Sequence, residues 1–305
     1  RAHKMTHEKV KRAYEIFGDG AGAEGNFCGV PEELAAADDS RFHVIPVPFE
    51  GTVSFGEGAS RAPQAIIEAT RNIELMDFET GRHPFAWGIH TAPSVCRNTS
   101  LQTALALKEA ALPSFTNGKL VVVLGGEHSI TLGALMALNE LGRPFSVLQL
   151  DAHSDLRDEY EGNRYSHACV MRRALELENL SKLVQLGVRS SSWFERQMEP
   201  DERLVTVSGR QVHHGQGLEA IEQLTEDVYI TLDVDAFDPS VIPATGTPEP
   251  DGLSWAQVTR LLRETFARRN VKGFDLVELA PLEGTVNSEA CAAVLAYRMM
   301  AWSLP

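Results

Sequence analysis

Short apolar runs rich in β-branched residues alternate along the chain with segments of helical periodicity. Runs of this kind are typical of strands that are buried on both faces. Six such runs occur, at residues 42–49, 119–126, 145–151, 183–189, 227–235 and 271–279. Segments that repeat apolar residues every three or four positions, as a helix with one buried face does, occur at residues 62–75, 129–141, 166–178 and 254–269.

This alternation predicts an α/β fold: a single three-layer domain with a largely parallel central sheet and helices on both faces. The segment 254–269 carries helix signals at both ends, because Ser254 is a good N-cap and Asn270 a common stop. We expect residues 41–305 to form this domain. Residues 1–40 are rich in Gly, Ala and Glu and are expected to form an N-terminal arm that could make an oligomer contact.

The composition narrows the class of partner. The 305 residues are 43% hydrophobic and 23% charged, as in an ordinary globular protein, and the net charge is −14. That charge argues against nucleic acid or an anionic membrane as a partner and is compatible with a small cationic molecule, although solubility alone would also explain it. The four cysteines are widely spaced, no secretory signal is evident, and no apolar stretch approaches about 18–20 residues, so we expect a cytoplasmic protein.

The segment "GAGAEG" at 20–25 matches the G-x-G-x-x-G fingerprint of dinucleotide-binding folds. That fingerprint binds phosphates only where a strand leads into it and a helix follows it. A charged helical segment precedes it here and "NFCGVPEE" follows, so no residue is expected to bind a dinucleotide or another organic cofactor.

Acidic residues and histidines follow directly after three of the predicted strands. The motifs are "GGEHS", "DAHSD" and "DVD", and their side chains are His128, Asp151, His153, Asp155, Asp233 and Asp235. In an open parallel sheet, functional groups gather at the carboxyl edge of the strands. If these three strands are neighbours, the six side chains converge there.

Each motif alone has an ordinary explanation: a hydrogen-bonded strand end, a polar turn, or a capping or core histidine. Together they do not, because four carboxylates packed without cations would repel one another and lose hydration, at a cost of roughly several kcal/mol. Two divalent ions bridged by shared aspartates remove that cost. Oxygen-rich ligation with a minority of imidazole favours Mn²⁺, and such a pair can hold a bridging hydroxide as a nucleophile.

Two further residues are candidates for chemistry at the same edge. Glu278 ends the strand "GFDLVEL", where it could bind a cationic substrate, steady a ligand, or simply form a salt bridge with an arginine. His167 lies just beyond the "DAHSD" loop and could shuttle protons, because imidazole titrates near neutrality, or could merely begin a helix.

The three motifs resemble a known family. "GGEHS", "DAHSD" and "DVDAFDPSVIPATGTPEPDGLSW" are similar to the three signatures of the ureohydrolases, the arginase and agmatinase superfamily. "PFEGTVSFGEGASRAPQAI" and "GFDLVELAP" match as well, so the resemblance runs from about residue 42 to residue 301. It implies an arginase-like fold, hydrolysis of a guanidino group to urea and an amine, two Mn²⁺ per subunit, and homotrimers or hexamers.

The resemblance also implies roles for the individual residues, with Asp151 and Asp233 bridging the two ions. The first ion would be bound by His128, Asp151, Asp155 and Asp233. The second would be bound by Asp151, His153, Asp233 and Asp235. Glu278 would pair with the guanidinium, and His167 would serve the departing amine.

The loop "LRDEYEGNRYSHACVMRR" bears on the substrate, because it resembles bacterial agmatinases more closely than arginases. Its acidic residues (Asp158, Glu159 and Glu161) would suit the distal ammonium of agmatine, although Arg157 and Arg164 oppose that effect. We therefore predict hydrolysis of agmatine to putrescine and urea by a metal-bridging hydroxide. The alternatives are another guanidino substrate, such as 4-guanidinobutyrate or arginine, and, more remotely, a deacetylase-like hydrolase with one Zn²⁺.

Overall fold

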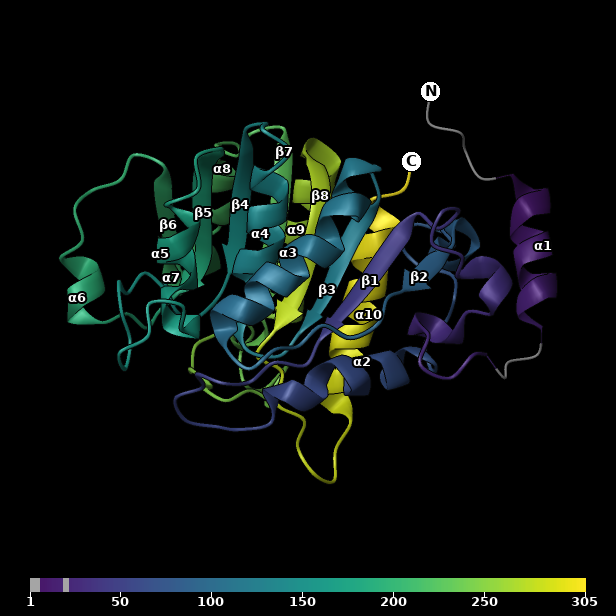
Figure 1. The fold of residues 1–305 in the computed structure, drawn as a ribbon, viewed down its shortest axis with the longest axis horizontal. Coiled ribbons are helices and arrows are strands. Elements are labelled where there is room, and N and C mark those ends of the chain that lie inside the picture. Colours follow the sequence, from purple (N-terminus) through teal and green to yellow (C-terminus); the bar gives the residue numbers. More distant parts are fainter. Residues whose placement is uncertain (1–5, 19–21) are drawn as a thin grey trace.

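A computed structural model describes residues 6–18 and 22–305. Its strands are β1 (Phe42–Val47), β2 (Ile89–Thr91), β3 (Leu120–Gly125), β4 (Phe145–Leu150), β5 (Leu180–Val188), β6 (Leu204–Ser208), β7 (Asp227–Asp233) and β8 (Asn270–Val277). They form one eight-stranded sheet in the order β2-β1-β3-β8-β7-β4-β5-β6 (Figure 1). Every pairing is parallel, which confirms the predicted sheet.

Helices cover both faces of this sheet. The helices of the described residues are α1 (His7–Phe17), α2 (Ala62–Thr70), α3 (Ser100–Thr116), α4 (Thr131–Asn139), α5 (Val170–Ala174), α6 (Trp193–Arg196), α7 (Gly209–His213), α8 (Gly217–Ile221), α9 (Trp255–Arg268) and α10 (Asn287–Trp302). Of these, α1 and α6 lie beyond the two edges of the sheet (Figure 1). Leu107 of α3 and Leu135 of α4 pack in the core on one face, in front of the sheet in Figure 1. Ile66 of α2 and Leu262 of α9 belong to the core on the other face. The three predicted layers are confirmed.

The predicted helices differ in how well their ends were placed. Helix α9 begins where expected, because the Ser254 side chain accepts a hydrogen bond from Gln257 N and the Gln257 side chain returns one to Ser254. The helix predicted over 166–178 is wrong in extent: a 3-10 turn, η6 (His167–Cys169), comes first and α5 ends at Ala174. Strands β2 and β6 and helices α3 and α10 were not among the predicted elements.

The predicted arm, residues 1–40, lies only partly within the described chain. Residues 1–5 and 19–21 are outside it, so the first two residues of "GAGAEG" are not described. Within residues 6–18 and 22–40, α1 is a regular helix, and Phe27 and Val30 are fully buried in the core. An oligomer contact through this arm stays a prediction. None of the helices in the described ranges is long and apolar enough to span a bilayer.

The register of the central strands sets where the site lies. Strands β3, β8, β7 and β4 are adjacent, and Leu276 of β8 pairs with Leu124 of β3 and with Leu232 of β7. Leu232 in turn pairs with Leu150 at the end of β4. Because the four strands are parallel and end level with one another, the residues that follow them emerge together at one edge.

Candidate metal centre

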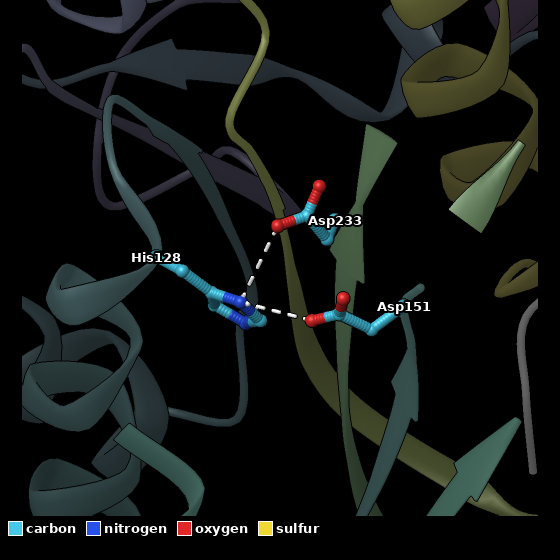
Figure 2. A group of neighbouring side chains, drawn as sticks. All are labelled: His128, Asp151 and Asp233. Atoms are coloured by element: carbon cyan, nitrogen blue, oxygen red, sulfur yellow. Dashed lines mark ion pairs between the residues drawn. The ribbon is translucent and has the colours of Figure 1, made fainter. Parts of the chain in front are cut away.

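The six residues predicted as metal ligands meet at this edge of the sheet. His128 Nδ1 lies 3.2 Å from Asp151 Oδ2, 2.9 Å from Asp155 Oδ2 and 3.5 Å from Asp233 Oδ2. Figure 2 shows three of these side chains pointing toward one another from different segments of the chain. The ligand atoms of His128, Asp151 and Asp233 all lie within 4.8 Å of one another, which is compatible with binding of a single ion.

A second group shares Asp151 with the first. His153 Nδ1 lies 2.9 Å from Asp235 Oδ2 and 3.6 Å from Asp151 Oδ1. The ligand atoms of these three residues also lie within 4.8 Å of one another. Two clusters that share one carboxylate form the arrangement expected of a dinuclear site.

Burial makes the charge of this centre costly without a cation. Asp151, Asp233 and Asp235 are at most 3% exposed. Burial, followed by the charges of Asp235 and Asp151, holds the pKa of Asp233 well above its usual range. Burial and the Asp151 charge likewise raise the pKa of Asp155. The metal-free centre therefore takes up protons, and divalent cations could replace those protons.

The same negative charges also raise the pKa values of the two histidines, against the effect of burial. Burial lowers the pKa of His153, but the carboxylates of Asp151 and Asp235 outweigh it and raise the pKa to about 12. Burial also opposes protonation of His128, whose pKa is nevertheless raised well above its usual value by Asp151 and Asp155. Both rings thus lie in a strongly negative field that favours any bound cation, whether a proton or a metal ion.

A buried chain of hydroxyl and carboxyl groups orients His128. Thr231 Oγ1 donates to Asp275 Oδ1 at 2.7 Å, so its oxygen is left to accept from His128 Nε2, 2.8 Å away. Asp275 also accepts from the hydroxyls of Thr131 and Tyr229. With the proton on Nε2, the lone pair of Nδ1 points into the carboxylate cluster, as a metal ligand requires.

His128 Nδ1 itself provides the test of fit. It is buried and has no hydrogen-bond partner within residues 6–18 and 22–305, although three carboxylates surround it. Without a metal ion, this nitrogen must carry a proton to lie among carboxylate oxygens, as the raised pKa of His128 indicates. A divalent metal ion could take the place of that proton, bound by the Nδ1 lone pair and the carboxylates together. The residues therefore fit the metal pair that the sequence predicts.

A second buried chain supports Asp151. Gln149 Nε2 donates to Asp151 Oδ2 at 2.8 Å, and Gln185 Nε2 donates to Gln149 Oε1 at 2.6 Å. Thr206 Oγ1 completes the chain by donating to Gln185 Oε1 at 2.9 Å. Four of these supporting residues were not predicted: Gln149, Gln185, Thr231 and Asp275. In the sequence each stands out as a polar residue within an apolar run that was predicted as a strand.

The centre opens into a cavity of about 280 Å³. His167 and Glu278 line it together with His128, His153, Asp155 and Asp233. Glu278 accepts a hydrogen bond from His128 N at 2.6 Å, and burial, followed by the Glu127 charge, raises its pKa to about 8. Its φ of 64° is left-handed for a non-glycine residue, a strain of about 1–3 kcal/mol that functional sites tolerate.

The acidic loop is placed differently from the expectation. Arg157 and Tyr160 line the cavity, with the Arg157 guanidinium 4.6 Å from the centre of the Tyr160 ring. Asp158, in contrast, is paired with Arg173 and Arg164, and Glu159 lines a separate pocket. Glu195, which was not predicted as a site residue, also lines this cavity.

Comparison with known protein families shows to which family the chain belongs. The sequence model of the Arginase family matches residues 40–301. The chain belongs to the arginase family. The resemblance to the ureohydrolases predicted from the motifs is confirmed, and it spans the sheet and the candidate metal centre.

Relatives within the arginase family are similar over most of their length. An N(1)-aminopropylagmatine ureohydrolase of Synechocystis sp. is 36% identical over 89% of this chain and 92% of its own. An agmatinase of Pyrococcus horikoshii is 34% identical over 81% of this chain and 87% of its own. The crystal structure of the agmatine ureohydrolase of Thermoplasma volcanium superposes with a TM-score of 0.81 and 32% identity, covering 88% of this chain and 92% of that one.

In this arginase-family centre, replacing Thr231 with valine is expected to weaken the first metal position. The change leaves His128 Nε2 without its acceptor, and loss of such a partner typically lowers metal affinity about 10–100-fold. Mn²⁺ titration followed calorimetrically would measure the loss, and Thr231→Ser should restore affinity. Thr259→Val removes a hydroxyl that only serves the backbone of α9 and is the matched control. Equal affinity in Thr231→Val and wild type would contradict the orienting role.

Proposed function

We propose that this protein hydrolyses agmatine to putrescine and urea, with two Mn²⁺ ions bound at the centre described above. Its family and relatives make it a ureohydrolase of the agmatinase type, acting on an agmatine-like guanidino substrate. The observation that carries the proposal is the meeting of two His/Asp clusters through Asp151 beside a cavity that Glu278 lines.

The proposed ligands divide into two sets that share Asp151 and Asp233. One set is His128, Asp151, Asp155 and Asp233, and the other is Asp151, His153, Asp233 and Asp235. The donor chemistry supports Mn²⁺, because carboxylate oxygens outnumber imidazoles and no thiolate takes part. Bound there, the ions would lower the pKa of water so that it can attack the guanidino carbon near neutral pH.

Glu278 is proposed to bind the guanidinium. One of its oxygens accepts from His128 N, and the residue lines the cavity, so the carboxylate is available to a ligand. A carboxylate pairs well with a planar guanidinium, and the cation would in turn lower the raised pKa of Glu278. Substrate binding and ionisation of Glu278 therefore favour each other.

His167 is proposed to protonate the departing amine. As the C–N bond breaks, its electron pair stays on the nitrogen, which must gain a proton to leave as a neutral amine. An imidazole that lines the cavity can supply that proton. The ring also stands edge-on to Tyr160, with centroids 5.8 Å apart, which restricts its orientation.

Glu195 lines the cavity and is proposed to contact the tail of the substrate. Burial opposes ionisation of Glu195, but hydrogen bonds from Ser192, Ser154 and Leu156 lower its pKa. The Glu195 carboxylate therefore carries a negative charge that suits an ammonium tail. A second candidate substrate is N(1)-aminopropylagmatine, which gives the Synechocystis relative its name. Ser191 and Glu195 also line an adjoining cavity of about 480 Å³, which leaves room for a longer tail.

A substrate panel with Mn²⁺ tests the proposal. We expect urea release from agmatine, or from its aminopropyl derivative, with a kcat/KM at least about tenfold above that for 4-guanidinobutyrate or arginine, equivalent to about 1.4 kcal/mol. Colorimetric detection of urea gives the comparison directly. Turnover confined to 4-guanidinobutyrate or arginine would reject the substrate assignment while leaving the ureohydrolase chemistry in place.

We also propose that residues 41–305 form the catalytic domain and that the protein assembles as a homotrimer or hexamer, with residues 1–40 contributing a contact. The Arginase family match to residues 40–301 supports that boundary. Light scattering of the full chain tests the assembly. A monomeric full chain would reject it.

A further inference from the structure

A threonine links the cavity histidine to a buried carboxylate. Thr52 Oγ1 lies 2.6 Å from Glu127 Oε1, 3.2 Å from His167 Nδ1 and 3.0 Å from His167 N. Thr52 belongs to the loop after β1, Glu127 follows β3, and His167 begins η6. Three segments far apart in the sequence therefore meet through one hydroxyl group.

The direction of these hydrogen bonds follows from the groups involved. The Glu127 carboxylate is fully buried and receives hydrogen bonds from Gly51 N, Thr52 N, Thr52 Oγ1 and Ser129 Oγ. Two backbone N–H groups already donate to Glu127 Oε2, and the single hydroxyl proton of Thr52 goes to Oε1. The Thr52 oxygen is then an acceptor, and His167 Nδ1 must donate to it.

This arrangement determines which ring nitrogen of His167 carries the proton when the ring is neutral. With a proton on Nδ1, neutral His167 has its lone pair on Nε2, the atom on the side of Ser54 in the cavity wall. When the ring is protonated, Nδ1–H still points to Thr52 and Nε2–H is the proton that can be transferred. The Thr231 hydroxyl likewise donates to Asp275 and accepts from a histidine, but it accepts from Nε2 of His128, so the lone pair of that ring lies on Nδ1.

We propose that Thr52 is a positioning residue for proton transfer: it accepts from Nδ1–H of His167 in both the neutral and the protonated ring, so that Nε2 is the nitrogen that takes up a proton and delivers it to the departing amine. This inference rests on the proposed role of His167. In the step it serves, the C–N bond electrons remain on the departing nitrogen, and the proton on His167 Nε2 moves to that nitrogen.

A competing partner makes Thr52 necessary. Ser166 Oγ lies 3.3 Å from His167 Nδ1, and a serine hydroxyl can either donate or accept. Without the Thr52 hydroxyl, Ser166 can donate to Nδ1 and favour the form with its proton on Nε2. In the native protein the Thr52 oxygen, committed as an acceptor by Glu127, opposes that form.

Valine and serine replacements of Thr52 separate positioning from loop anchoring. Thr52→Val keeps the side-chain shape and the backbone hydrogen bonds of Gly51 and Thr52 to Glu127, so the loop stays anchored. We expect Thr52→Val to lower kcat about tenfold or more with KM within about twofold, since general acid catalysis contributes roughly 10²–10⁴ in rate. Thr52→Ser should retain most of the activity, and bound Mn²⁺ should match wild type in both variants. The melting temperature should fall in Thr52→Val alone, because valine removes a donor to buried Glu127 and the acceptor of His167 N. A kcat within twofold of wild type in Thr52→Val, or an equally low kcat in Thr52→Ser, would overturn the proposal.

The protonation site can be measured without turnover. Long-range ¹H–¹⁵N spectra of the metal-free, ¹⁵N-histidine-labelled full chain distinguish the two neutral forms, and His167→Asn assigns the signals. We expect Nδ1–H in wild type and Thr52→Ser and a larger share of Nε2–H in Thr52→Val. Nε2–H as the main form in wild type would overturn the inference even if Thr52→Val failed to fold. A wild-type enzyme without ureohydrolase activity would instead reject the proposed function, because the spectrum reports His167 independently.

Discussion

Replacing Asp233 with asparagine is expected to lower kcat by at least about a thousandfold, equivalent to about 4 kcal/mol. Asparagine keeps the shape and can still accept the hydrogen bond that Asp235 N donates to Asp233 Oδ1 at 2.9 Å. It removes the negative charge at a position that both metal ions are proposed to share. We therefore expect fewer than two Mn²⁺ per chain after dialysis, measured by mass spectrometry of the metal, together with the loss of urea release.

Asp238 provides the matched control because it is the next acid of the same motif. Its carboxylate accepts from Ser240 and Gly252 in a surface turn, so Asp238→Asn should retain activity within a few-fold. In the metal-free state, by contrast, the substitution of Asp233 should not lower stability. Since burial and neighbouring charges disfavour ionised Asp233, metal-free Asp233→Asn should melt at or above the temperature of metal-free wild type. Full activity in Asp233→Asn would contradict the bridging assignment.

Removing the metal should have the second large effect, a drop in both activity and melting temperature that Mn²⁺ reverses. A ligand that binds only the folded state stabilises it by about 2.7 kcal/mol when its free concentration is about 100 times its dissociation constant. For a chain of this size, each such ion corresponds to roughly 4 °C in melting temperature. Calorimetry after chelation and after Mn²⁺ addition measures the difference, with Mg²⁺ as the comparison ion.

The pH dependence of this stabilisation follows from the raised pKa values. Glu278, with a pKa of about 8 in the folded protein, and Asp233, also raised, contribute stability that is complete below the unfolded pKa of about 4 and is lost as the pH rises toward the folded pKa. His153 acts in the same direction, because its contribution is complete below about pH 6.5 and declines as the pH rises toward its folded pKa of about 12. The metal-free protein should therefore become less stable between about pH 6 and pH 8.

Metal binding should show the opposite trend over the same interval. Mn²⁺ must displace the protons held by Asp233 and His153, so its affinity should increase by about 1.4 kcal/mol per pH unit for each proton released. The rise in melting temperature on adding Mn²⁺ is accordingly expected to be larger at pH 8 than at pH 6. An equal or smaller rise at pH 8 would contradict the proton competition that the buried carboxylates imply.

Periodicity and strand-end chemistry were sufficient to predict the sheet and to bring six residues together. The apolar runs before His128, Asp151 and Asp233 identified buried parallel strands. Because functional groups gather at the carboxyl edge of a parallel sheet, the polar residues after these runs were expected to lie together. Helix α10 was not predicted because it is buried on most of its surface and shows little amphipathic pattern. Strand β2, with three residues, is too short for a periodic signal.

The supporting groups needed the structure, because their partners come from other strands. Nothing in the sequence pairs Thr231 with Asp275, or Thr52 with Glu127, across long stretches of chain. The acidic loop illustrates the opposite error. Composition suggested that Asp158 faces the substrate tail, whereas an ion pair with Arg173 engages it.

The central claim is that the two clusters sharing Asp151 bind a pair of Mn²⁺ ions. Anomalous diffraction at the manganese edge, from crystals grown with Mn²⁺, tests it most directly. We predict two peaks of similar height, one beside His128 and one beside His153, with Asp151 and Asp233 contacting both and a separation of about 3.5–4 Å. A single peak in Mn²⁺-saturated crystals, or two peaks without a shared carboxylate, would contradict the account.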